Sequence, residues 1–369
     1  MPIPALRVIN IRRGRELRTI KDMATIKRRL ALLFLLVCYT LLGRDFGPPV
    51  GAKMAGFELP DQDGKVRTLG SLLGPKGAVI LFYQSADWCP YCKAQLVELE
   101  QNQTEFRDLG LGIAAISYDS VAVLHNFAER RGIHFPLLSD RDSKVIRELG
   151  ILNETTPTDN PFFGVPYPGS FVLDAQGVVT AKYFEDDFRE RYTSADILAH
   201  QFGVRLQAAR SEVEGKQLKL EASASNALVG AGQRVSLTLD IEMKPNMHVY
   251  APGVEDNYIP ITWKMKESDA AAAHEVSYPP SEKLHLAAID ETVPVYRDHF
   301  RLSREITIAQ DAKLRPALNS SGKFTVEGTL RYQACDDRVC YIPQELPVKW
   351  TFQYAEFDKE RAPVELRRK

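Results

Sequence analysis

The chain has 369 residues, of which 44% are hydrophobic and 26% are charged, and its formal net charge is -1. This length exceeds one ordinary domain, so we expect two domains with additional terminal segments. The near-neutral charge argues against a nucleic-acid partner, because nucleic-acid binding normally requires a basic excess.

Residues 1–46 are interpreted as a basic N-terminal region with an export or anchoring signal. Three basic residues at 27–29 precede an apolar run at 30–42. That run is short for a transmembrane helix but has the length of a signal-peptide core. No small-x-small cleavage site precedes Arg44, so an uncleaved anchor, the one predicted contact with a membrane, is the alternative. Both interpretations predict a periplasmic or otherwise extracytoplasmic location, where disulfides are stable.

Residues 47–203 alternate short apolar runs with segments of helical periodicity. The continuous apolar run 78–83 predicts a strand buried on both faces. A helix is predicted to begin near Cys92, followed by a strand at 112–117, a second amphipathic helix, and a hairpin at 170–179. This alternation favours an α/β domain with a largely parallel central sheet.

The chain has five cysteines, and four of them form two close pairs outside the N-terminal apolar run. The first pair, Cys89 and Cys92, lies between the predicted strand and helix. Unpaired N–H groups at a helix N-terminus favour a thiolate and lower its pKa, although nearby Asp87 opposes this. We expect Cys89 to attack a partner disulfide and Cys92 to resolve the mixed disulfide.

Three segments of this domain carry a resemblance to the thioredoxin-like superfamily, specifically to its redoxin branch of AhpC/TSA peroxiredoxin-like proteins: 57–64, 88–92 and 167–174. The resemblance implies a thioredoxin-like fold in which a cis-proline faces the dithiol and holds the substrate backbone. Pro168 occupies the matching position, and Trp88 precedes the first cysteine. Trp88 and Pro168 are therefore the predicted substrate-binding residues.

Two alternatives for the first cysteine pair stay open. Peroxiredoxins place Thr or Ser three residues before the peroxidatic cysteine and an arginine near the segment of Pro168. Here Ala86 stands three residues before Cys89, Cys89 stands three before Cys92, and the arginine is missing, so a peroxidase is the alternative to dithiol exchange. Half of a four-cysteine zinc site is the second alternative, but the other pair is too widely spaced. The seven histidines show no metal-ligand spacing, so no metal and no cofactor are predicted.

The remaining chain predicts a linker at 204–216, a second domain at 217–355 and a frayed polar tail at 356–369. Alternation of polar and apolar residues in the second domain is typical of half-buried antiparallel strands. The predicted strands lie at 217–222, 235–241, 300–308 and 324–334. The expected architecture is an all-β immunoglobulin-like sandwich.

The second cysteine pair, Cys335 and Cys340, lies where two of these strands meet. The four residues between them suit a hairpin loop, and cysteines facing each other across such a hairpin can form a disulfide. Strand parity places Cys335 on the polar face and Cys340 on the apolar face. A bulge, or an irregularity at Pro343, is therefore expected.

Three segments carry a second resemblance, to the N-terminal periplasmic domain of the disulfide reductase DsbD: 332–335, 340–343 and 295–298. That domain passes electrons from a thioredoxin-like partner to client proteins. The resemblance implies that Cys340 exchanges with the partner dithiol and that Cys335 closes the local disulfide. A loop caps the cysteines in this family, and 286–293 holds the corresponding place here without its acidic-aromatic residues. An inert structural disulfide is the alternative.

Three functions follow from these patterns. The first is an extracytoplasmic thiol–disulfide oxidoreductase that relays electrons between the two cysteine pairs. The second is a thiol peroxidase whose Cys89 or Cys92 is oxidised to sulfenic acid and re-reduced by the second pair. The third is a non-catalytic binding module with a structural disulfide. The predicted partners are protein thiol or disulfide clients and an external reductant such as a membrane electron donor.

Overall fold

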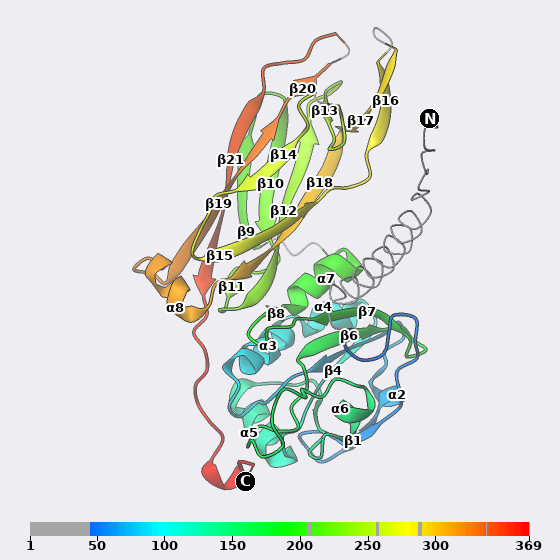
Figure 1. Ribbon diagram of the computed structural model, residues 1–369, viewed down its shortest axis with the longest axis vertical. Helices are drawn as coiled ribbons and strands as arrows, with labels where there is room; N and C mark the ends of the chain where they lie inside the picture. Colours follow the sequence, from blue (N-terminus) through cyan, green and yellow to red (C-terminus); the bar gives the residue numbers. More distant parts are fainter. Residues whose placement is uncertain (1–44, 205–207, 256–257, 287–289, 337, 369) are drawn as a thin grey trace, which may run out of the picture. The chain divides into compact units, whose positions relative to one another are not determined.

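The structure is a computed structural model that describes residues 45–204, 208–255, 258–286, 290–336 and 338–368 (Figure 1). Residues 46–369 form one compact unit. The predicted N-terminal signal or anchor lies outside the described residues, apart from its last two positions. Among the described residues, no helix is long and apolar enough to cross a membrane.

The first domain is built on a five-stranded sheet of order β5-β4-β3-β6-β7. β3 is parallel to β4, and β4 to β5, whereas β6 and β7 are antiparallel additions. The strands are β3 (Gly77–Phe82), β4 (Leu111–Ser117), β5 (Leu137–Ser139), β6 (Gly169–Leu173) and β7 (Val179–Phe184), with a separate pair β1 (Glu58–Pro60) and β2 (Val66–Thr68). The helices are α2 (Leu69–Leu72), α3 (Pro90–Gln101), α4 (Gln103–Asp108), α5 (Val121–Arg131), α6 (Lys144–Glu148) and α7 (Ser194–Phe202).

β3 is buried along its whole length because both faces of the sheet are covered. Val79 and Leu81 belong to a core shared with α3, α5 and α7, whereas Ile80 and Phe82 belong to the core on the α2 and α6 side. Successive side chains of a strand point to opposite faces, so a strand between two cores must be apolar at every position. The predicted α/β thioredoxin-like fold is confirmed.

The second domain is a sandwich of antiparallel sheets, which confirms the predicted all-β immunoglobulin-like class. One sheet has the order β15-β18-β12-β10-β9, and β8 also pairs with β12; the others have the orders β11-β21-β19-β14 and β16-β17-β13-β20. The bounds are β8 (Arg191–Tyr192), β9 (Ala208–Glu214), β10 (Leu218–Ala224), β11 (Leu228–Val229), β12 (Gln233–Met243), β13 (His248–Tyr250), β14 (Thr262–Met265), β15 (Ala271–Ser277), β16 (Glu282–Leu286), β17 (Glu291–Arg297), β18 (His299–Ile308), β19 (Lys323–Tyr332), β20 (Ala334–Cys335) and β21 (Gln344–Tyr354). Short helical turns are α8 (Asp311–Leu314), η1 (Arg315–Ala317) and η2 (Val364–Leu366).

Most of the predicted linker 204–216 belongs to the sandwich. Residues 208–214 form β9, which pairs antiparallel with β10, and Val213 packs against the sandwich core. The segment has few apolar residues, so its strand character comes from main-chain pairing with β10. The expectation of a dozen-residue linker is therefore wrong.

The two domains share main-chain and buried side-chain contacts. β8 follows the first domain's sheet but pairs in parallel with β12 of the sandwich. The buried carboxylate of Glu98 on α3 accepts hydrogen bonds from the N–H groups of Ser194 and Ala195 and from the side-chain amide of Asn226 in the sandwich. A carboxylate removed from water needs such donors, so this contact ties α3 and α7 to the second domain.

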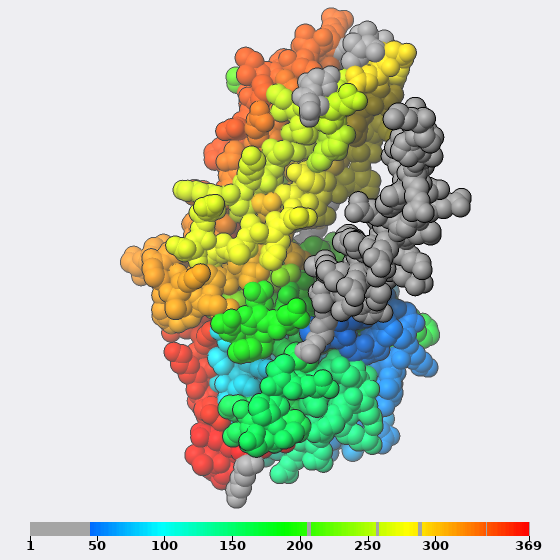
Figure 2. All heavy atoms as spheres, viewed as in Figure 1, coloured from blue at the N-terminus to red at the C-terminus, as the bar shows by residue number. Residues whose placement is uncertain are grey.

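The C-terminal segment 356–368 lies on the first domain (Figure 2). The Arg361 guanidinium donates to both carboxylate oxygens of Asp87, at 2.8 and 2.6 Å. The Lys93 ammonium donates to the carbonyl of Glu360 at 2.7 Å. Asp87 and Lys93 are buried, so both need these partners. The expectation of a frayed tail is wrong, because its charges pair with buried charges of the first domain.

Candidate active site

Cys89 is the N-cap residue of α3, which begins at Pro90, two residues before the start predicted near Cys92. Pro90 occupies the first helical turn, and the Cys89 sulfur accepts a hydrogen bond from the N–H of Cys92 at 3.2 Å. The two cysteines form a disulfide with their Cα atoms 5.3 Å apart. After reduction, the N–H of Cys92, which has no partner within the helix, would favour a thiolate on Cys89 and lower the pKa of its thiol.

Both sulfur-bearing side chains of this pair are shielded from solvent. Cys89 is 1% exposed and Cys92 is 0% exposed. The Trp88 ring packs against Phe162 with centroids 4.4 Å apart, and its N–H donates to the Tyr118 hydroxyl at 2.8 Å. Around the other side of the motif, Tyr91 packs edge-on against Phe357 of the C-terminal segment at 4.6 Å. A partner can therefore reach Cys89 only after a local rearrangement.

The charge of Asp87, next to the redox pair, is neutralised by the C-terminal segment. Burial acts to raise the pKa of Asp87, but hydrogen bonds from Arg361 and from the N–H of Ala362 outweigh it and hold that pKa below its usual value. Asp87 was expected to oppose a thiolate on Cys89. The paired guanidinium reduces that effect while the segment is docked.

Asp119 is a buried positioning residue that the sequence analysis missed. It lies just beyond β4 and accepts from the N–H of Ala86 at 2.7 Å and from the Ser85 hydroxyl at 2.8 Å, so it holds the loop that leads to Cys89. Burial raises the pKa of Asp119 to about 6, against these hydrogen bonds. The sequence signal that could have found Asp119 is its position just after β4. β4 is parallel to β3, so the residues that follow the two strands lie at the same edge of the sheet.

Pro168 lies beside the redox loop, but its geometry differs from the expectation. Gly169, the next residue, pairs with Phe82 at the end of β3. The chain contains no cis peptide bond among the described residues, so the cis-proline implied by the resemblance is wrong. The N–H of Tyr167 donates to the carbonyl of Ile151 at 2.7 Å, and this ladder holds the segment extended on the way into β6.

The second pair, Cys335 and Cys340, also forms a disulfide, with Cα atoms 4.0 Å apart. Cys335 is 1% exposed, whereas Cys340 is exposed. Strand parity predicted the reverse, because the chain leaves β19 at Tyr332 and joins β13 of another sheet at Ala334. The strand is therefore irregular, as predicted, but the change of sheet occurs at Gln333 and not at Pro343.

Aromatic and aliphatic side chains surround this second disulfide. The Tyr250 hydroxyl lies 3.6 Å from the Cys335 sulfur and 3.5 Å from the Cys340 sulfur. Tyr258 packs against Tyr250 with ring centroids 4.6 Å apart. Leu286 and Val293, the ends of the predicted capping segment, join the same apolar cluster. Positions 287–289 of that segment lie outside the described residues.

The two cysteine pairs lie at opposite ends of the sandwich's long strands. β12 begins at Gln233, which pairs with Arg191 of the first domain, and it spans 11 residues. β13 continues beyond the other end of β12, and its His248 pairs with Cys335. Within the sandwich, Figure 1 shows β13 and β20 at the end opposite to α8 and β11. A strand of this length spans about 30 Å, too far for the two pairs to meet in this arrangement.

An open groove of about 830 Å³ borders Trp88. It combines aromatic side chains of the first domain with arginines from Arg141 and the C-terminal segment. Its lining includes Trp88, Tyr118, Phe162, Arg141, Arg361 and Arg368. Asp87, Asp119, Asp142 and Glu365 also line it, so the groove combines aromatic side chains with charges of both signs.

The fold and the helix-start disulfide define an oxidoreductase domain of the redoxin class, joined to a β-sandwich with a second disulfide. The chain belongs to the AhpC/TSA family, whose sequence profile matches residues 50–182. The profile described as "Thiol:disulfide interchange protein DsbD, N-terminal" matches residues 216–350. The two recognised parts of the chain are thus a redoxin domain and a domain like the N-terminal part of DsbD.

Individual relatives match the redoxin part. Peroxiredoxin Bcp of Escherichia coli (strain K12) is 34% identical over 137 residues, which are 36% of this chain and 82% of that protein. The chloroplastic peroxiredoxin Q of Triticum aestivum is 34% identical over 134 residues, covering 36% of this chain and 58% of that protein. The crystal structure of peroxidoxin BcpB from Mycobacterium tuberculosis aligns with 26% identity and a TM-score of 0.37, covering 44% of this chain and 99% of that one.

Proposed function

We propose that this protein is an extracytoplasmic thiol–disulfide oxidoreductase with two exchange sites, one in each domain. The observation that carries the proposal is the position of Cys89 as N-cap of α3, with Cys92 one turn along and bonded to it. This arrangement gives a nucleophile and a resolving thiol in one motif. The DsbD-like domain and the exposed Cys340 support a second exchange site.

The chemistry at the first site is a two-electron exchange. In the reduced form, the Cys89 thiolate attacks one sulfur of a client disulfide, forms a mixed disulfide and expels the other client sulfur as a thiolate. The Cys92 thiolate then attacks the Cys89 sulfur and releases the second client thiol, leaving Cys89–Cys92 oxidised. The client gains two electrons and two protons overall, and the reverse sequence regenerates the dithiol at the expense of a donor dithiol.

The relay between the two pairs is proposed to run between separate chains. About 30 Å of strand separates the end of the sandwich that contacts the redoxin domain from the end that holds Cys335. The exposed Cys340 of one chain can instead meet the redoxin domain of another chain once its C-terminal segment has moved. An external reductant, such as a membrane electron donor, must supply the electrons, and folded proteins with thiols or disulfides are the clients.

Trapping tests this relay. In a Cys92→Ser, Cys335→Ser variant, each site has lost the thiol that would attack and release a mixed disulfide. A disulfide between Cys89 and Cys340 should therefore accumulate. We expect a covalent dimer on a non-reducing gel, and peptide mapping should join residues 89 and 340. A variant that also carries Cys89→Ser is the control and should give no linkage between residues 89 and 340. If no 89–340 linkage forms across a series of glutathione redox buffers, the relay is wrong.

Thiol-dependent peroxide reduction is the second candidate, because the named relatives of the redoxin part are peroxiredoxins. The residues three positions before Cys89 and Cys92 are Ala86 and Cys89, so the hydroxyl of the family pattern is absent. We therefore expect hydrogen peroxide to oxidise the reduced pair no faster than it oxidises an ordinary accessible dithiol. Rapid peroxide consumption that a single cysteine substitution abolishes would establish the peroxidase instead.

A further inference from the structure

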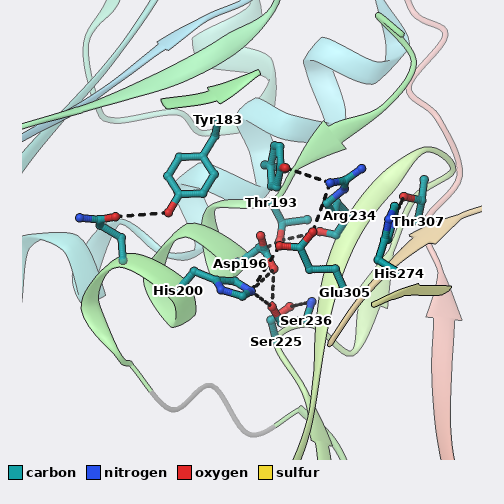
Figure 3. Close-up of polar contacts among 12 residues, drawn as sticks. Tyr183, Thr193, Asp196, His200, Ser225, Arg234, Ser236, His274, Glu305 and Thr307 are labelled. Atoms are coloured by element: carbon teal, nitrogen blue, oxygen red, sulfur yellow. Dashed lines mark hydrogen bonds and ion pairs between the residues drawn. The ribbon is translucent and has the colours of Figure 1, made fainter. Parts of the chain in front are cut away.

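The junction between the two domains holds a cluster of metal-ligating side chains that the redox chemistry does not use. Asp196 and His200 lie one turn apart on α7, and Glu305 projects from β18 of the sandwich (Figure 3). One ligand atom from each of the three lies within 4.8 Å of the other two. The i, i+4 spacing of Asp196 and His200 is visible in the sequence, but Glu305 is more than 100 residues away and gives no local signal.

The geometry points to a divalent-metal site, and we propose that Asp196, His200 and Glu305 bind one Zn²⁺ that clamps the redoxin domain to the sandwich. The His200 Nε2 atom lies 3.4 Å from a carboxylate oxygen of Glu305 and 3.7 Å from one of Asp196. Ligands bonded to zinc at about 2.1 Å in a tetrahedron are about 3.4 Å from one another. The two separations from His200 Nε2 are therefore close to those in a zinc site, and the Asp196 and Glu305 donors lie within 4.8 Å of each other.

The second domain also orients these donors. The Ser236 hydroxyl donates to the carboxylate of Asp196. It also lies 2.9 Å from His200 Nε2, and a metal bound at that nitrogen would take the place of this contact. Arg234 donates to the second oxygen of Glu305 at 3.2 Å. Such partners fix the direction of metal ligands and raise the affinity of a site. A cavity of about 90 Å³ lies beside the cluster and is lined by His200 and Ser236, but not by Asp196 or Glu305.

Charge at the junction favours a cation. Asp196 is fully buried, and its Oδ2 atom has no hydrogen-bond partner among the described residues. The nearby guanidinium of Arg234 also pairs with Glu185 and Glu190, so it cannot balance every carboxylate around it. An unbalanced buried carboxylate of this kind is stabilised when a cation binds it.

The donor set selects the kind of metal. One imidazole nitrogen with two carboxylate oxygens is a combination that zinc accepts at four-coordinate sites. Mg²⁺ and Ca²⁺ prefer oxygen ligands alone. Because two ligands come from the redoxin domain and one from the sandwich, a bound ion would link the domains independently of the oxidation state of the cysteines.

Zinc binding to the full-length protein tests this proposal. The protein is first oxidised, so that both disulfides are closed, and any free thiol is alkylated, which removes sulfur ligands. After treatment with chelator, ZnCl₂ is added, and bound metal is measured by equilibrium dialysis. We expect one zinc per chain and a loss of affinity of about tenfold or more in His200→Ala and in Glu305→Gln. Ca²⁺ and Mg²⁺ at the same concentration should not compete.

His125→Ala is the matched control. His125 also lies between two carboxylates, but it faces Asp63 through Nδ1 and Glu129 through Nε2, so one ion cannot bind all three groups. This variant should bind zinc as the wild type does. Zinc binding that is unchanged in His200→Ala, or no stoichiometric binding by the wild type, overturns the proposal and leaves the cluster as an ion-pair network.

Two measurements on the zinc-loaded wild type do not depend on the folding of a variant. X-ray absorption at the zinc edge should show nitrogen and oxygen neighbours at about 2.0–2.2 Å and no sulfur. A first shell that contains sulfur contradicts the site. Zinc should also raise the thermal unfolding midpoint of the wild type, because it binds the folded state only.

Discussion

The two disulfides of this chain differ in what controls access to them. Cys89–Cys92 is buried under Tyr91, Trp88 and a C-terminal segment that begins more than 260 residues later. Cys335–Cys340 has one buried sulfur and one exposed cysteine in the same hairpin. The first disulfide is thus covered in part by a segment distant in the sequence. The second disulfide is exposed on one side, at Cys340, and its exposure depends on the local hairpin. This difference predicts that the two disulfides respond differently to a reductant.

Removal of residues 356–369 should cause the largest change in the reduction rate of Cys89–Cys92 relative to that of Cys335–Cys340. Without the segment, Asp87 and Lys93 lose buried charge partners, and the cover over Tyr91 is lost. We expect dithiothreitol to reduce Cys89–Cys92 about 100-fold faster, because opening the site no longer breaks buried ion pairs. The rate is measured by maleimide labelling and peptide mass mapping under native conditions.

A single substitution distinguishes the contribution of the Arg361–Asp87 ion pair from that of the rest of the C-terminal segment. Arg361→Ala should accelerate reduction of the same disulfide less than the truncation does, since Phe357 stays in place. Arg131→Ala removes an exposed arginine of α5 and serves as the control. If the truncated protein reduces Cys89–Cys92 at the wild-type rate, the segment does not control access.

Asp119 makes the stability of the first site's scaffold depend on pH. Its pKa is about 6 in the folded protein and near 3.8 when unfolded, because burial disfavours the charged form. Below about pH 3 the carboxyl is neutral in both states. Between about pH 4 and 6 it ionises in the unfolded state but stays neutral in the folded state, so the free energy of unfolding falls; above about pH 6 the folded state holds the buried charge and the fall levels off. Relative to Asp119→Asn, the wild type should lose on the order of 2 kcal/mol between pH 4 and 7.5.

Urea unfolding midpoints at the two pH values measure this difference. Asp108→Asn, which changes an exposed carboxylate of α4, should run parallel to the wild type. If the free energy of unfolding of Asp119→Asn and that of the wild type change with pH in the same way, the buried charge of Asp119 does not destabilise the folded state. The second disulfide should keep the same reduction rate in both proteins.

In the wild type itself, Cys335–Cys340 should be reduced before Cys89–Cys92. A reductant attacks whichever sulfur it can reach, and Cys340 is exposed while both cysteines of the first pair are buried. We expect a rate difference of about tenfold in dithiothreitol at pH 7.5, since partial opening of the first site is needed before attack. Time-resolved mass mapping of both pairs in one sample checks the order. Earlier reduction of Cys89–Cys92 would contradict the buried-site interpretation.

Local patterns predicted both fold classes and the position of the first cysteine pair between a strand and a helix, because these depend on neighbours in the sequence. Cys89 lies between a continuous apolar run and an apolar helical stripe, which placed the pair at a strand-to-helix junction but set the helix start near Cys92 instead of Pro90. The docking of Arg361 on Asp87 could not be predicted, since an exposed-looking arginine gives no sign of its partner. The junction of Asp196, His200 and Glu305 likewise depends on how two domains pack. The exposure of Cys340 was mispredicted because strand parity fails where a strand changes sheets.

The smallest expected effect concerns the second disulfide alone. Tyr250→Phe removes a hydroxyl that lies 3.5 Å from the Cys340 sulfur and 3.6 Å from the Cys335 sulfur. A hydroxyl that donates to a thiolate lowers the pKa of the thiol, so its loss should slow exchange of the reduced pair with a disulfide by about threefold at pH 7. Tyr258→Phe is the control, because its hydroxyl donates to Glu291 and only its ring packs near the pair. Stopped-flow exchange with an aromatic disulfide measures both variants. Equal rates for Tyr250→Phe and the wild type would mean that apolar packing alone, and not the hydroxyl, sets the reactivity of the half-open site.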